Sequence, residues 1–127
     1  MPWAGKNKCK MNEMAHHAEE PTAKELDDLL QSLWVRNYPL LAERMKLIRA
    51  AKDKVDAGYL DNTCRKDGEE AAHKLAGILG TFGLPQGSAL ASKIEVLLSN
   101  DTPTCLQRAG ELRSWVSELE AVIASHP

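Results

Sequence analysis

The chain has 127 residues, with 16 Lys plus Arg against 18 Asp plus Glu and a formal net charge of −2. This length is enough for a single domain around one core, and the balanced charge argues against nucleic acid or a membrane surface as a partner. Hydrophobic residues make up 43% of the chain but aromatic residues only 5%, and helix formers such as Ala, Leu, Glu and Lys dominate. We therefore expect an all-α protein whose partner is another protein or a small molecule.

The cysteines and the length of the apolar segments indicate where the protein is located in the cell. Cys9, Cys64 and Cys105 are an odd number with no CxxC or metal-ligand spacing, which is typical of a reducing compartment. No export leader is evident, and the apolar runs are far shorter than the roughly 20 residues that cross a bilayer. We expect a soluble, cytoplasmic protein.

Residues 1–21 show no apolar period, and we expect a flexible or loosely docked tail. Two groups of residues in it could bind a ligand: Lys6, Lys8 and Lys10, and the adjacent pair His16 and His17. Alternating lysines in a tail are usually solvated, and a histidine pair without a second cluster is not specific for a metal. Neither group therefore predicts a site.

Two helices are predicted next. The first begins at Thr22, where Thr22-x-x-Glu25 has the capping-box pattern, and should end near Asn37. The second begins at Pro39, which suits a first helical turn, and stops at Gly58, which accepts the left-handed conformation after a helix. The apolar faces are Leu26, Leu29, Leu30 and Leu33 in the first helix and Leu41, Met45, Ile48 and Val55 in the second.

Three further helices follow. The third runs from Asn62, a good cap, to about Thr81, and Gly83-Leu84-Pro85 breaks it. The segment Asn100–Pro103 ends the fourth helix and starts the fifth, with Thr102 as the cap. The apolar stripes are Leu90, Ile94 and Leu97 in the fourth helix and Leu106, Ala109, Leu112, Val116, Leu119 and Ile123 in the fifth. Short connections between helices two to five predict an antiparallel up-down four-helix bundle over residues 22–127, with a short additional N-terminal helix covering one end.

One histidine stands out on the third helix. On a wheel at about 100° per residue, the apolar residues of this helix form one broad sector. That sector contains Cys64, Gly68, Ala71, Ala72, Leu75, Ile78, Leu79 and Phe82. His73 falls nearly opposite its centre, so we expect the imidazole to be solvent-accessible. Its neighbours on the exposed face are Lys66, Glu69, Glu70, Gly77 and Gly80.

Gly77 and Gly80 are unusual on an exposed helix, because each glycine there costs roughly 1 kcal/mol relative to alanine. One explanation is a flat floor beside the histidine ring, over which another protein's active site can close. The other is close contact with a neighbouring helix or preparation of the helix end. The pattern alone leaves both open.

The stretch from Ala72 to Leu84, continuing through Leu90 and Ile94-Glu95, resembles the signature of histidine-containing phosphotransfer (HPt) domains. This signature has a histidine, an apolar residue two positions on, a glycine four positions on, and then a second glycine and a turn. The resemblance implies that His73 accepts a phosphoryl group from a receiver-domain aspartyl phosphate and passes it to another receiver domain. It also implies a phosphotransfer intermediate without kinase activity of its own, with receiver domains and hybrid sensor histidine kinases as partners.

The resemblance implies no cofactor and no metal site in this chain, because the receiver domain brings the acceptor aspartate and the Mg²⁺. We expect a monomer. Family members often carry a lysine three residues after the histidine, but this chain has Ala76 there. Lys74 or Lys93 could substitute for that charge. The supporting residues are then Lys74, Gly77 and Gly80, and the candidate docking surface is Lys66, Glu69, Glu70 and Lys93.

Other classes of function fit less well. A kinase is disfavoured because the chain has no phosphate-cradling glycine loop and no room for a nucleotide-binding domain. A metal-binding bundle is disfavoured because the inner faces show no Glu-x-x-His pairs. The stronger rival is an adaptor bundle that docks receiver domains while His73 carries no phosphate.

Overall fold

The computed structural model describes residues 22–126, and it divides into two units between Leu33 and Trp34. The first unit includes the start of the first described helix, and the second, Trp34–Pro127, includes the helical bundle. The lysine cluster, the histidine pair and Cys9 lie outside the described residues.

Helix α2, Ala23–Asp56, begins with the predicted capping box. The Thr22 backbone N–H donates to Glu25 Oε1 over 2.8 Å, and the Glu25 backbone N–H donates to Thr22 Oγ1 over 3.1 Å. These two bonds satisfy backbone donors that have no partner within the helix. The predicted start of this helix is therefore confirmed.

The predicted break before Pro39 is wrong, because α2 continues through this proline without interruption. Proline lacks a backbone N–H and crowds the carbonyl four residues earlier, which disfavours a helix interior. Here Trp34 and Leu41 are both buried, and their spacing of about two turns places them on one face. Burial on both sides of Pro39 offsets its cost, so the expected short N-terminal helix is the first part of α2.

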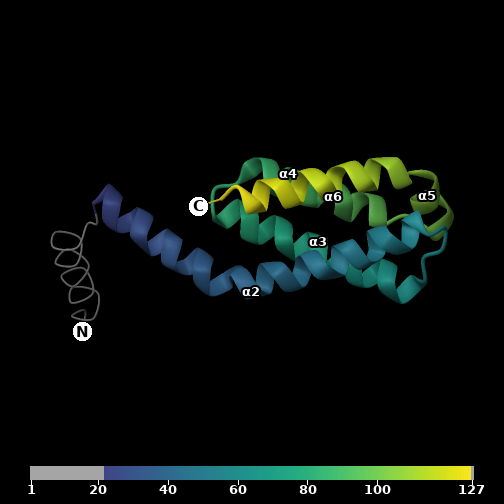
Figure 1. Ribbon diagram of the computed structural model, residues 1–127, viewed down its shortest axis with the longest axis horizontal. Helices are drawn as coiled ribbons and strands as arrows, with labels where there is room; N and C mark the ends of the chain where they lie inside the picture. Colours follow the sequence, from purple (N-terminus) through teal and green to yellow (C-terminus); the bar gives the residue numbers. More distant parts are fainter. Residues whose placement is uncertain (1–21, 127) are drawn as a thin grey trace, which may run out of the picture. The chain divides into compact units, whose positions relative to one another are not determined.

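Four more helices follow α2 in the described part of the chain, and no strand is present there (Figure 1). Their bounds are α3 Asn62–Thr81, α4 Pro85–Leu98, α5 Thr102–Gln107 and α6 Ala109–Ala124. Gly58 and Gly83 adopt φ values of 87° and 71°, which supports the predicted turns after α2 and α3. The caps of α3 and α5 are Asp61 and Asp101, each one residue before the predicted cap.

The predicted fifth helix is two helices, because the chain leaves the α-helical conformation at Arg108. The Arg108 N–H donates to the carbonyls of Thr104 and Cys105, and its guanidinium donates to Glu111. Sequence periodicity did not reveal this break, because Leu106, Ala109 and Leu112 keep a three-residue spacing through it.

The core lies between α3, α4, α6 and the part of α2 that follows Leu33, and Figure 1 shows these segments running along one another. Its largest fully buried side chains are Leu41, Ile48, Leu75, Leu79, Ile94, Leu97, Leu98, Leu112, Leu119, Val116 and Cys105. Gly68 allows α3 to approach α2 closely, because a Cβ atom there would lie 3.0 Å from the Cβ of Ala51. The predicted all-α four-helix bundle is confirmed.

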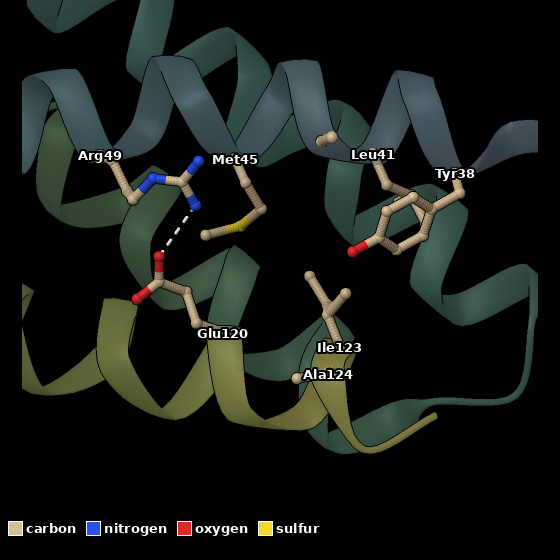
Figure 2. A pocket seen from close by; sticks show the side chains of 8 residues that line it. Tyr38, Leu41, Met45, Arg49, Glu120, Ile123 and Ala124 are labelled. Atoms are coloured by element: carbon tan, nitrogen blue, oxygen red, sulfur yellow. Dashed lines mark hydrogen bonds and ion pairs between the residues drawn. The ribbon is translucent and has the colours of Figure 1, made fainter. Parts of the chain in front are cut away.

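A groove of about 180 Å³ lies between α2 and α6. Figure 2 shows Tyr38 towards one end of it and the ion pair of Arg49 and Glu120, 2.9 Å apart, towards the other. Among residues 22–126, no helix is long and apolar enough to span a membrane.

Candidate functional site

His73 lies in the middle of α3, and its side chain is 72% exposed. The residues beside it on the inner face, Ala72 and Leu75, are completely buried. The core therefore fixes the rotation of α3 about its axis and holds His73 on the outer surface, as the helical wheel predicts.

The imidazole of His73 is bonded to a carboxylate from the neighbouring helix. Its Nδ1 atom lies 3.0 Å from Oε2 of Glu95 on α4. A carboxylate only accepts hydrogen bonds, so Nδ1 carries the hydrogen and donates it. In the neutral ring this leaves the lone pair on Nε2 available as a nucleophile.

Glu95 and His73 belong to an open hollow of about 410 Å³ that contains three carboxylates. The residues lining it are Lys66, Glu69, Glu70, His73 and Glu95. Within it Glu69 lies 3.8 Å from Arg65, and Glu70 lies 4.0 Å from Lys74. The structure thus brings three of the four predicted docking residues together around the histidine.

A second open hollow, of about 550 Å³, also includes His73 but has a different character. The residues lining it are Arg44, His73, Lys74, Gly77, Ile78 and Thr81. Two cations line it together with the histidine, Arg44 from α2 and Lys74 from α3. His73 therefore stands between a carboxylate-rich hollow and a cationic one.

The two glycines on the histidine's face are not required by packing in the described structure. A Cβ atom at Gly77 would meet nothing within 4 Å, and one at Gly80 would make ordinary contact with Ser88 Oγ at 3.6 Å. Close approach of a neighbouring helix therefore does not explain them. Both glycines leave the surface of α3 low on the face of His73, and preparation of the helix end stays open as a second explanation for Gly80, which precedes the last residue of the helix.

Lys93 lies elsewhere. Its Nζ atom is 5.9 Å from the ring centroid of Trp115 on α6, where Arg108 approaches the same ring at the same distance. Such cations over an indole ring are favourable. Lys93 lines neither of the two hollows that contain His73.

The helical wheel missed two residues of this site, Glu95 and Arg44. Glu95 was noted only as the end of the resembling stretch, and no role was predicted for it. Both come from other helices, and a wheel drawn for α3 cannot show which residues of α2 and α4 face it. The only available signal was the inclusion of Glu95 in the resemblance.

Metal-binding and thiol chemistry find little support in residues 22–126. No group of three or more His, Cys, Asp and Glu in this range is arranged to hold a metal ion. Cys64 and Cys105 are free thiols, and burial raises the pKa of each above its ordinary value. A raised pKa lowers the fraction of reactive thiolate.

A protein-family model described as Hpt domain matches residues 13–124, which is most of the chain. No significant match was found among curated proteins or among solved structures.

Proposed function

Because the chain belongs to the Hpt domain family, we propose that His73 accepts a phosphoryl group from a receiver-domain aspartyl phosphate and passes it to another receiver domain. Hpt domains are histidine phosphotransfer intermediates of two-component signalling rather than kinases. The observation that carries the proposal is the pairing of an exposed His73 with Glu95 through Nδ1. This pairing leaves the outer ring nitrogen free to react.

In the proposed step the lone pair of Nε2 forms a bond to phosphorus. The bond between phosphorus and the aspartate oxygen breaks, and its electron pair stays on the leaving carboxylate. The ring becomes positively charged because Nδ1 keeps its hydrogen, and the Glu95 carboxylate stabilises that charge across their hydrogen bond. Transfer to the next receiver is the same step in reverse.

The partners of Hpt domains are receiver domains and the kinases of phosphorelays. For this chain we propose that the receiver supplies the acceptor aspartate and the Mg²⁺ ion, while the bundle supplies the nucleophile as a monomer. The low surface at Gly77 and Gly80 and the exposed position of His73 support this division, because they give a receiver's active site room to close over the ring.

The test uses a receiver domain phosphorylated with radiolabelled acetyl phosphate and Mg²⁺. The wild-type chain should acquire acid-labile, base-stable label, and the His73→Gln variant should acquire none while its helicity and melting temperature stay unchanged. The matched control replaces His16 and His17 with glutamine and should label normally. A labelled His73→Gln variant would place the acceptor elsewhere, and an unlabelled wild type that still binds the receiver would favour the adaptor.

A further inference from the structure

Arg44 has no carboxylate partner although its side chain is half-buried. It forms no ion pair with any described residue, and its Nε atom is buried without a hydrogen-bond partner. Buried polar groups almost always have a partner, so each exception needs an explanation. An arginine also keeps its charge at any physiological pH.

The position of Arg44 brings this unpaired charge to the candidate phosphoacceptor. Arg44 lies on α2, and it lines the same hollow as His73. Glu95 contacts the ring of His73 from α4, and Arg44 approaches the same site from α2.

A phosphoryl group on His73 needs a cation nearby. It carries about two negative charges, and the other hollow at His73 already contains the carboxylates of Glu69, Glu70 and Glu95. Lys74 lies 4.0 Å from Glu70 and is therefore partly neutralised. Arg44 is thus the cation of this hollow that no carboxylate of the described residues neutralises.

We propose that Arg44 binds the phosphoryl oxygens of phosphorylated His73 and supplies the positive charge that Ala76 cannot. This inference rests on the proposed function, since it requires His73 to carry the phosphate. A guanidinium suits the role because its planar set of donors matches phosphoryl oxygens in pairs. Binding the phosphoryl group also gives the guanidinium partners for its donors.

The experiment phosphorylates the full chain with phosphoramidate, a small-molecule donor that needs no receiver. Three variants of Arg44 are compared with wild type: Arg44→Gln, Arg44→Met, which keeps an apolar stem, and Arg44→Lys, which keeps the charge. The matched control is Arg49→Gln, since Arg49 lies on the same helix but pairs with Glu120 of α6 beside the groove in Figure 2. Circular dichroism checks that each variant is folded.

Two quantities are measured, the phosphorylation rate and the pKa of the phosphoryl group by ³¹P NMR. A bound guanidinium favours the doubly charged phosphoryl group, so both neutral variants should raise its pKa by about 0.5 to 1 unit and slow phosphorylation about 3- to 10-fold. Arg44→Lys should recover most of both changes, and Arg49→Gln should match wild type. A purely structural role would leave the phosphoryl pKa unchanged.

Two other outcomes distinguish failure of the role of Arg44 from failure of the proposed function. If phosphorylated His73 forms in every variant with the wild-type phosphoryl pKa and rate, Arg44 does not bind the group, and His73 remains the acceptor. If wild type gains no phosphate on His73 from either phosphoramidate or a receiver, both the proposed function and the role of Arg44 are wrong. If one of the two neutral variants unfolds, the other is used in its place. Arg44→Lys keeps the positive charge on a different side chain and therefore shows whether the charge alone is sufficient.

Discussion

Oε2 of Glu95 on α4 lies 3.0 Å from Nδ1 of His73 on α3, although the two residues are 22 positions apart in the sequence. The helix beside the candidate phosphoacceptor thus decides which ring nitrogen carries the hydrogen. Glu95 links the bundle's packing to the chemistry, because Ile94 and Leu97 anchor α4 in the core on either side of it.

Two substitutions of Glu95 should distinguish the effect of its negative charge on phosphotransfer from the effect of its hydrogen bond to His73. Glu95→Gln keeps an acceptor for Nδ1–H but loses the negative charge, so we expect about tenfold slower transfer from a phosphorylated receiver. Glu95→Ala also loses the acceptor and should be slower still. Rapid-quench measurement of phosphohistidine formation gives both rates.

The control for this comparison is Glu69→Gln, which removes a carboxylate from the same hollow without touching the ring. Glu69 belongs to the candidate docking surface but does not bond the ring, so Glu69→Gln should slow transfer less than Glu95→Gln does. Equal slowing in the Glu69 and Glu95 variants would mean that only the total charge of the hollow matters.

The sequence was enough to predict the helical class, the start of α2, the whole of α3 and the exposure of His73. These features depend on periodicity and on short-range capping, which lie within one helix. The apolar sector predicted for α3 contains its buried residues Gly68, Ala71, Ala72, Leu75 and Leu79. Where a helix has one strongly apolar face, burial of that face fixes which residues are left outside.

Features that depend on tertiary packing could not be predicted in the same way. Burial of Trp34 and Leu41 carries α2 through Pro39 against its local preference, and Arg108 breaks a helix whose apolar spacing continues. The partners of His73 from α2 and α4 depend on how the helices pack side by side. Single-helix periodicity contains no information about that packing.

Gly80 offers a test of the low surface beside the histidine. A glutamate there adds bulk and negative charge on the face of His73, about two turns further along α3, so Gly80→Glu should block receiver docking and transfer while the bundle stays folded. Gly80→Ala is the control, because its Cβ makes only ordinary contact with Ser88, and it should raise stability by up to about 1 kcal/mol. Binding is measured by titration calorimetry and folding by urea denaturation. Normal docking of Gly80→Glu would show that the receiver contacts another surface.

Asp61, at the start of α3, should make the free energy of unfolding depend on pH in the acid range. Lys54 donates to Asp61 Oδ1 over 2.7 Å and the Cys64 N–H donates to Oδ2 over 3.0 Å, and these bonds hold the pKa of Asp61 below its ordinary value. The stabilisation by ionised Asp61 is complete above about pH 3.9, the pKa of this group in the unfolded chain. It is lost as the pH falls through the lower pKa that Asp61 has in the folded chain.

The measurement for Asp61 is the urea midpoint of wild type and Asp61→Asn between about pH 2 and 6. Asparagine can still cap the helix but does not ionise, so the wild-type advantage should shrink as the pH falls. An advantage that stays constant over this range would show that ionised Asp61 contributes nothing to stability.

Lys74 should contribute to phosphotransfer only in part. It lines the cationic hollow with His73, but it also lies 4.0 Å from Glu70, one turn earlier on α3. Lys74→Ala should therefore slow transfer or shorten the phosphohistidine lifetime by no more than about tenfold, as expected for one exposed charge contact. Ala76→Lys installs a cation about one turn after His73, closer to the histidine than Lys74 is around the helix axis, and should change the same quantities in the opposite direction. Abolished transfer in Lys74→Ala would make this lysine essential, whereas no effect of either change would mean that Arg44 and the receiver together supply the compensating charge.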